Sequence, residues 1–178
     1  MSNESTTVTE GWFKRNKSLN FNSKQFWLVA ESGYLYKCGS GSKWHTSTDI
    51  EDFSWIPKVK YVMNGYAENI EGSYIDVRQS SIVWNYRNAE QDHAKLFIHD
   101  LYNVIQRTVK GYQVEIIYGD GYLKVKPMQI KKATLIDKLL QKLTKTSKID
   151  WLFYLGNNSD DEAVFEFLKT TKLCKNYF

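Results

Sequence analysis

Six consecutive polar residues at 157–162, Asn-Asn-Ser-Asp-Asp-Glu, carry side-chain oxygens that could bind a hard metal ion. They follow an apolar run at 151–155 and Gly156, as expected where a buried strand ends. Ligands bind at the carboxyl ends of strands in open α/β sheets, and carboxylate and amide oxygens suit Mg²⁺. The same residues could instead cap the following helix, with Asp161 and Glu162 beside its positive end. Spacing alone favours the cap without excluding a metal site.

A second candidate for chemistry is Lys132, which follows Lys-Val-Lys-Pro at 124–127 and stands at the expected start of a helix. The positive amino-terminal end of a helix together with a lysine could hold a phosphate group. The competing interpretation is an ordinary solvated lysine, which is the commoner arrangement for any single lysine side chain. Lys132 is therefore a candidate phosphate contact with this alternative open.

Hydrophobic periodicity indicates which elements would position these groups. Two short strands are expected at 26–30 and 34–37, separated by a Glu-Ser-Gly turn, and a loop is expected at 39–48. Intervals of three and four between apolar residues predict helices, and alternation of apolar with other residues predicts hairpins. The helices are expected over 50–70, 89–109, 131–144 and from about residue 160, and the hairpins over 73–87 and 112–127.

The chain is expected to combine two kinds of α/β structure. Its middle forms an antiparallel α+β layer of hairpins and helices, whereas its end reads as a helix, an apolar strand at 150–155, an acidic loop and a helix. A continuously apolar strand between helices is typical of a parallel sheet that is buried on both faces. These patterns predict an α/β (α+β) fold class.

Composition limits the function classes. The 178 residues fit one domain or one and a half, and the aromatic content of 15% is too high for a disordered chain. The net charge of +4 is mild, with one concentration of lysines between residues 124 and 138. Such a field suits an anionic small molecule as easily as a nucleic acid. Nucleic-acid binding is not expected, because binders more often carry a basic stripe on one face.

The compartment is expected to be cytoplasmic. The two cysteines, Cys38 and Cys174, are far apart and predict reduced thiols rather than a disulfide framework. No apolar run approaches the roughly 18 residues of a membrane span, so no membrane partner is expected. The beginning of the chain is polar and lacks the features of a signal peptide, and residues 1–25 are expected to form a polar leader and the start of a core remnant.

Four stretches of the chain follow an order that matches a known family. They are LVAESGYLYK at 28–37, GSYIDVRQSSIVWNYRNAE at 72–90, YLKVKPMQIKKATLIDKLL at 122–140 and WLFYLGNNSDDEAVFEFL at 151–168. They resemble, in the same order, the patterns AAEHGYFIR, GSxIExKxxSLVWHYRDAD, IVEVRPxGVNKGxAVxxLL and FVLCIGDDxTDEDMFxxL. These patterns belong to trehalose-6-phosphate phosphatases and to the phosphatase-like second half of trehalose-6-phosphate synthases, in the haloacid-dehalogenase-like superfamily.

The resemblance implies a partial haloacid-dehalogenase-like Rossmannoid core with an α/β cap of antiparallel hairpins and helices. Residues 26–49 would be a core strand segment, 50–127 the cap-like region and 128–178 the C-terminal part of the core. The implied ligand is trehalose 6-phosphate, held between core and cap. The implied protein partners are trehalose synthase and phosphatase subunits.

By position in the family patterns, Glu31 would bind sugar hydroxyls. Arg78, Arg87 and Lys126 match basic residues of the family patterns and would bind the substrate. They keep positive charge in this chain, although Arg78 replaces a lysine and Lys126 an arginine.

The remaining matches concern the phosphate and the metal. Lys132 matches the phosphate-contacting lysine, and Asn157 and Asp161 match two aspartates of the magnesium motif. Asn157 is a weaker ligand for Mg²⁺ than the aspartate it replaces. The resemblance therefore implies Mg²⁺ as the cofactor and, at the same time, a degenerate metal site.

The departures from the family bear on catalysis. The family's nucleophile and its acid/base partner are the aspartates of a DxDGT motif, and no Asp-x-Asp sequence occurs in this chain. The SGR motif is also missing, GDD has become GNN at 156–158, and the histidine of WHYR is Asn85. Phosphoryl transfer through an aspartyl phosphate needs a carboxylate nucleophile and a metal that offsets phosphate charge. The polar stretch at 157–162 is therefore interpreted as the remains of a site.

Three functions remain open on the sequence. The first is a non-catalytic phosphatase-like module of trehalose biosynthesis that binds trehalose 6-phosphate or regulates a synthase/phosphatase complex. The second is a fragment of an active, Mg²⁺-dependent trehalose-6-phosphate phosphatase. The third is a protein-interaction domain without sugar binding, because missing core strands would expose apolar edges. The first is favoured by the four matched patterns together with the absent nucleophile motif.

Overall fold

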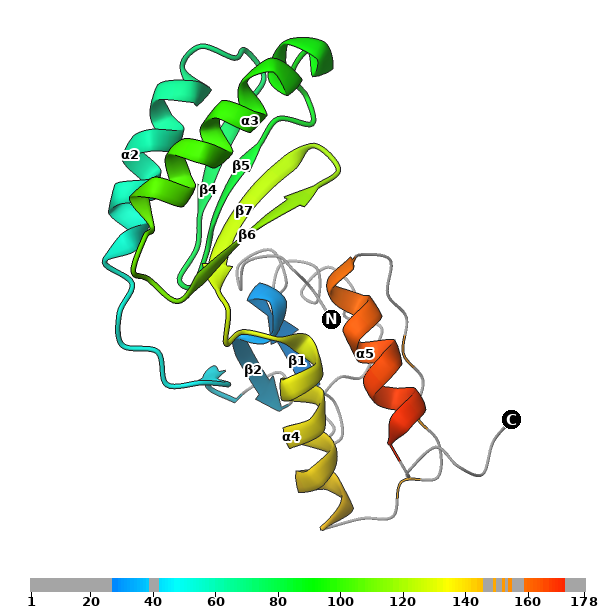
Figure 1. Cartoon of the computed structure of the whole chain (residues 1–178). Coiled ribbons are helices and arrows are strands. Elements are labelled where there is room, and N and C mark those ends of the chain that lie inside the picture. The colour runs from blue at the N-terminus through cyan, green and yellow to red at the C-terminus, as the bar shows by residue number, and fades with distance from the viewer. Residues whose placement is uncertain are drawn as a thin grey trace. The chain divides into compact units, whose positions relative to one another are not determined.

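The computed structural model describes residues 27–38, 42–145, 149, 152, 154 and 159–171, apart from the side chains of Gln91, Ser159 and Asp160 (Figure 1). Contacts divide the chain into two compact units. Unit 1 contains the described residues up to Thr48 and from Ile130 onward, and unit 2 is Asp49–Gln129. No helix among the described residues is both long enough and apolar enough to cross a membrane.

Unit 2 is a four-stranded antiparallel sheet with two helices on one of its faces (Figure 1). The strand order is β4-β5-β7-β6, so the two predicted hairpins are joined through β5 and β7. The strands are β4 (Tyr74–Val77), β5 (Ile82–Asn85), β6 (Val114–Gly119) and β7 (Tyr122–Pro127), and the helices are α2 (Trp55–Ala67) and α3 (Gln91–Thr108).

Alternation along the strands builds the core of unit 2. Ile82 and Trp84 of β5 lie opposite Val125 and Leu123 of β7, and all four side chains are fully buried. Because successive side chains of a strand point to opposite faces, this set lies on one face of the sheet. It packs against buried residues of the two helices, namely Val59, Met63, Leu101 and Ile105.

The described residues of unit 1 form a small antiparallel sheet and two helices. The sheet joins β1 (Trp27–Ala30), β2 (Leu35–Cys38) and β3 (His45–Thr46) in that order, and the turn η1 (Glu31–Gly33) connects the first two strands. The helices α4 (Lys132–Thr144) and α5 (Ser159–Thr170) pack through Ile136, Leu140 and Val164.

The structure confirms the predicted hairpins and helices, with two corrections. The helix expected over 50–70 is shorter, because it begins at Trp55 and ends at Ala67. Just before its first residue, the Asp52 carboxylate accepts a hydrogen bond from the Ser54 amide at 2.8 Å. The loop expected over 39–48 contains the two-residue strand β3, because strand pairing with β2 depends on tertiary position rather than on local pattern. The strand expected at 150–155 lies outside the described residues except for Leu152 and Tyr154, neither of which is assigned to a strand.

Candidate functional site

The turn after β1 in unit 1 has an unusual backbone. Glu31, Ser32 and Gly33 all have positive φ, at 51°, 58° and 101°, and all three residues are buried. Positive φ is uncommon for residues other than glycine and often marks a functional turn. A Cβ added at Gly33 would lie 3.3 Å from the Cα of Lys132, so the turn packs closely against the start of α4. Two of the family-matched residues, Glu31 and Lys132, therefore lie in neighbouring segments of one unit.

Lys132 is the centre of a buried ion pair. Its Nζ lies 2.6 Å from Oδ1 of Asp161, and the two side chains are only 1% and 5% exposed. The hydroxyl of Tyr154 donates a second hydrogen bond to the same Asp161 oxygen, also at 2.6 Å. The structure thus brings together the residue predicted to contact phosphate and one of the two predicted metal ligands, although 29 positions separate them in sequence.

The chemical consequence is charge neutralisation inside unit 1. A buried ammonium needs a partner, because an isolated buried charge is costly, and Asp161 is that partner at hydrogen-bond distance. The positive charge of Lys132 that could act on a phosphate is thereby offset by the Asp161 carboxylate. Asn157, the other predicted metal ligand, lies outside the described residues.

A second set of charged residues lies in one row across the sheet of unit 2. The Arg78 amide donates to the Ser81 carbonyl at 2.8 Å, and Lys126 pairs with Glu115 in the register of β6 and β7. Ile82 lies opposite Val125, so extending that register by one residue places Ser81 beside Lys126. Because Leu123 and Val125 face the helices, Lys126 points to the other face of the sheet.

Each cation of this row has a carboxylate partner that is still reached by solvent. Two nitrogens of Arg78 lie 2.7 Å from Oδ2 of Asp76, and Nζ of Lys126 lies 3.1 Å from Oε1 of Glu115. The two basic side chains are 12% and 5% exposed, whereas the acids are 36% and 34% exposed. Solvent therefore reaches the acids of this row more than its cations.

Arg87, the third predicted substrate contact of unit 2, is not part of this row. It follows the other end of β5 and is 62% exposed. Its Nη2 donates to the carbonyl oxygen of Asp120 at 2.9 Å and lies 3.8 Å from the Asp120 carboxylate. Arg87 therefore contacts the β6–β7 turn, roughly 20 Å along the strand direction from Ser81.

Several residues of these sites were missed from the sequence. Tyr154 lies in the apolar run that predicts a strand, and nothing local distinguishes its hydroxyl from that of a core tyrosine. Glu115 becomes visible only through its cross-strand pairing with Lys126. For Asp76 a signal existed, because it stands where the quoted family pattern has glutamate. The Ser81 hydroxyl is buried and has no hydrogen-bond partner among the described residues, which only the structure reveals.

The fold defines the class of this protein. The described residues form a mixed α/β structure with two antiparallel sheets, and the solved structures that it matches are haloacid-dehalogenase-like trehalose phosphatases. The sequence profile of the trehalose-phosphatase family matches residues 3–177, and the chain belongs to that family.

Relatives and solved structures give the same assignment. The chain is 31% identical over 139 residues to the bifunctional trehalose-6-phosphate synthase/phosphatase of Thermoproteus tenax, a match that covers 78% of this chain and 18% of the relative. It is 28% identical over 144 residues to a probable UDP-forming trehalose-phosphate synthase of Arabidopsis thaliana, covering 80% and 17%. The C-terminal domain of Candida albicans trehalose-6-phosphate phosphatase superimposes with a TM-score of 0.80 at 25% identity, over 95% of this chain and 58% of that one. The chain thus spans less than one fifth of these two relatives.

The described residues do not fit the Mg²⁺ that this family generally uses. Oδ1 of Asp161 already accepts hydrogen bonds from Lys132 and Tyr154, and a cation at that oxygen would lie beside the Lys132 ammonium. Within the part of the chain that the structure describes, no group of three or more His, Cys, Asp or Glu side chains could hold a metal ion. No step of a reaction is assigned to a metal in this chain.

Proposed function

We propose that this chain is a non-catalytic phosphatase-like domain of trehalose biosynthesis that binds trehalose 6-phosphate. The observation that carries the proposal is the buried Lys132–Asp161 pair, to which the Tyr154 hydroxyl also donates a hydrogen bond. The two paired residues match the phosphate-contacting lysine and a metal-binding aspartate of the family patterns. The chain has no Asp-x-Asp sequence to supply the family's carboxylate nucleophile, and the Lys132 ammonium is already paired with Asp161.

The row of charged residues in unit 2 supports binding without turnover. Arg78 and Lys126 are basic residues at family-matched positions, and their carboxylate partners are about one third exposed. A phosphate group forms strong charge-assisted hydrogen bonds with guanidinium and ammonium groups. Trehalose 6-phosphate would therefore replace the carboxylates as partner of these cations.

The test is a calorimetric titration of the 178-residue chain with trehalose 6-phosphate, with trehalose as the uncharged comparison. We expect binding that requires the phosphate. Lys126→Met keeps the packed stem and removes the charge, so binding should weaken at least about tenfold through loss of a charge-assisted hydrogen bond. Lys95→Met, in an exposed pair with Asp92, is the matched control and should leave the affinity unchanged.

The absence of turnover is tested separately. Incubation of the chain with trehalose 6-phosphate and Mg²⁺ should release no phosphate above the rate without protein. Mg²⁺-dependent release that disappears in Lys132→Met would show an active phosphatase and overturn the proposal. The intact mass of the native polypeptide then decides whether this chain is a fragment of a longer enzyme.

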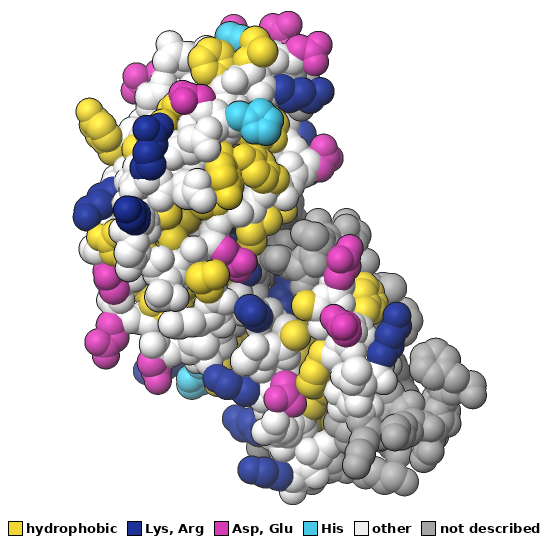
Figure 2. All heavy atoms as spheres, in the orientation of Figure 1, with side chains coloured by type: hydrophobic (Ala, Val, Ile, Leu, Met, Phe, Trp, Pro, Cys, Tyr) yellow, Lys and Arg dark blue, Asp and Glu magenta, His cyan; other side chains and the backbone are white. Residues whose placement is uncertain are grey.

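A regulatory role in a complex is the form of this function that the surface favours. Tyr61 of α2 and Leu96 of α3 are 82% and 75% exposed. Figure 2 shows hydrophobic side chains gathered on unit 2 along α3 and the β6–β7 hairpin. A contiguous exposed apolar patch is typical of a protein contact surface, whereas the single residues Tyr61 and Leu96 are not evidence of one. Synthase or phosphatase subunits are the proposed partners of the patch along α3 and the β6–β7 hairpin. Sedimentation of the chain alone and with such a subunit tests this, and two unchanged monomeric species would contradict it.

A further inference from the structure

A cavity of about 400 Å³ lies in unit 2, apart from the row of charged residues described above. Its wall is formed by the segment that begins unit 2, the start of α2, the start of β6 and the segment that ends unit 2. A volume of this size is within the range of small-molecule sites in proteins. None of the residues that line it was assigned a role by the family patterns.

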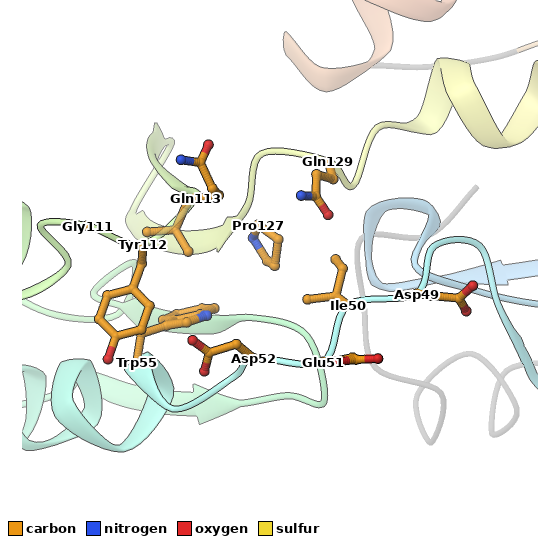
Figure 3. Close-up of a pocket in the computed structure, with 11 residues that line it drawn as sticks. Asp49, Ile50, Glu51, Asp52, Trp55, Gly111, Tyr112, Gln113, Pro127 and Gln129 are labelled. Carbon is orange, nitrogen blue, oxygen red and sulfur yellow. The ribbon is translucent and has the colours of Figure 1, made fainter.

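The walls of the cavity combine apolar surfaces with a few polar groups (Figure 3). Trp55 and Pro127 are buried, and Ile50 is half-buried. The Gln129 side chain points from the outgoing segment toward Ile50, and the Asp52 carboxylate is turned toward Tyr112 and Trp55. The polar ends of Asp49, Glu51 and Gln113, in contrast, point away from this centre in Figure 3. The polar side chains that point into the cavity are thus the Asp52 carboxylate and the Gln129 amide, and they lie between apolar walls.

Hydrogen bonds hold the polar side of the cavity in place. The Tyr112 hydroxyl accepts a hydrogen bond from Nζ of Lys58 at 2.9 Å and lies 3.2 Å from the hydroxyl of Ser54. The Asp52 carboxylate accepts from the Ser54 amide at 2.8 Å. Hydrogen bonds from the Ser54 side chain and amide lower the pKa of Asp52, so its carboxylate is ionised near neutral pH. The acceptor that faces the cavity is therefore a positioned negative charge.

The chemistry of the walls selects the ligand class. An anion would meet Asp52 within the site and Asp49 and Glu51 at its margin, three carboxylates against the one ammonium of Lys58 beside Tyr112, so net electrostatic repulsion disfavours it. A wholly apolar ligand would leave Asp52 and Gln129 without partners when it displaces water. A polyhydroxylated ring satisfies both conditions, because its hydroxyls donate to the carboxylate and pair with the amide while its C–H face packs on the half-buried Ile50 and on Pro127.

We propose that this cavity is a second ligand site of the chain, which binds an uncharged sugar. The inference goes beyond the proposed function and is independent of it, because Arg78, Lys126 and Lys132 take no part. A bound sugar would contact both the incoming segment at 49–52 and the outgoing segment at 127–129, where the chain enters and leaves unit 2. It would thereby tie these two segments together.

The test is a titration of the ¹⁵N-labelled 178-residue chain with glucose and with trehalose, followed by amide chemical shifts. We expect saturable shifts at Gly111, Gln113 and Gln129, which line the cavity. Asp52→Asn keeps an acceptor for the Ser54 amide and removes the charge, and should weaken binding about tenfold. Glu51→Gln, the neighbouring carboxylate that points away, is the matched control and should leave the affinity unchanged.

Two further ligands, one anionic and one cationic, test whether the cavity selects an uncharged sugar. Glucose 6-phosphate should shift these amides less than glucose does, and putrescine should not saturate them. Absence of saturable shifts with either sugar, equal losses in Asp52→Asn and Glu51→Gln, or tighter binding of putrescine than of glucose would each overturn the proposal. Trehalose 6-phosphate binding that depends on Lys126 and survives Asp52→Asn reports only on the proposed function, so the two can fail separately.

Discussion

Unit 1 and unit 2 each contain a lysine–carboxylate pair, and the two pairs differ in the exposure of the acid. Lys132 and Asp161 lie 2.6 Å apart with 1% and 5% of their side chains exposed. Lys126 and Glu115 lie 3.1 Å apart, and Glu115 keeps 34% of its side chain in contact with solvent. The lysines are equally buried, so the surroundings of the acids account for most of the difference between the pairs.

This difference in the exposure of the acids predicts different roles for the two ion pairs, one in stability and one in binding. When both charges are out of water, removal of either one leaves the other unpaired at a cost that folding cannot easily absorb. When the acid is partly solvated, water or another anion can replace it. The pair of unit 1 is therefore expected to support the fold, and the pair of unit 2 to be open to an incoming phosphate. The following predictions test this contrast, from the largest expected effect to the smallest.

The largest effect is expected from Asp161→Ala. It leaves the Lys132 ammonium buried without its partner and should reduce the free energy of unfolding by about 3–5 kcal/mol. Urea denaturation followed by circular dichroism measures the loss. Glu162→Ala, an exposed acid on the same helix, is the control and should change stability by less than about 0.5 kcal/mol.

A double replacement checks the cause. Lys132→Met combined with Asp161→Leu removes both charges and keeps apolar volume, so it should recover much of the stability lost in Asp161→Ala. If the double variant were as unstable as the single one, packing rather than the unpaired charge would explain the loss.

The next effect concerns the turn that packs against the Lys132 backbone. Gly33→Ala places a side chain at φ 101° and 3.3 Å from the Cα of Lys132, so it should destabilise unit 1 by about 2 kcal/mol. Gly65→Ala is the matched substitution in unit 2: it lies within α2 with no neighbouring atom within 4 Å of the new Cβ. It should stabilise by about 0.5–1 kcal/mol. Thermal unfolding of both variants measures these two opposite changes in stability. A stabilising effect of Gly33→Ala would contradict the close packing of the turn against Lys132.

A smaller effect is expected when the acid of the open pair is removed. Glu115→Ala should cost only about 1 kcal/mol in urea denaturation, because solvent reaches the site and can hydrate Lys126 in part. The same variant removes a negative charge from beside Lys126 and should tighten trehalose 6-phosphate binding severalfold in calorimetry. Asp92→Ala, from the exposed pair with Lys95, serves as control for both readouts. A loss of stability as large as that of Asp161→Ala would remove the distinction between the pairs.

Much of the fold of unit 2 could be predicted from sequence, because its pattern is local. Alternating residues such as Ile82 and Trp84 identified the strands, and intervals of three and four identified α2 and α3. The contact between β5 and β7, which joins the hairpins into one sheet, could not be predicted, since any edge strand of one hairpin could pair with the other. The cavity could not be predicted either, because its walls come from four segments that only the tertiary structure brings together.

The candidate sites also combine features that could be predicted from the sequence with features that could not. The resemblance made Lys132 a phosphate contact and Asp161 a metal ligand, each as a separate residue. Their mutual ion pair depends on the packing of α4 against α5, which no local pattern specifies. Tyr154 illustrates the limit most clearly: within an apolar run, a tyrosine that packs and a tyrosine that donates to a carboxylate look alike in sequence.

The smallest predicted effect comes from a tyrosine–aspartate pair of unit 2, the counterpart of Tyr154 and Asp161 in unit 1. The Tyr66 hydroxyl donates to Asp100. Burial, then this hydrogen bond, then the charge of Asp100 raise the pKa of Tyr66 from 10.0 to about 12. Because the folded state keeps this proton longer than the unfolded state, the contribution of Tyr66 to stability is complete below pH 10. It is lost as the pH rises from 10 toward 12.

Unfolding by urea at about pH 9 and about pH 11 measures this loss. Tyr66→Phe should lower the pH dependence between these two conditions, and the difference from the unmodified chain isolates Tyr66 from Tyr86 and Tyr118, whose pKa burial also raises. Asp100→Asn removes the charge while keeping an acceptor, so the pKa of Tyr66 should fall part of the way toward its ordinary value. An unchanged pH dependence in Tyr66→Phe would show that this surface pair, unlike the buried pair of unit 1, contributes nothing measurable to the fold.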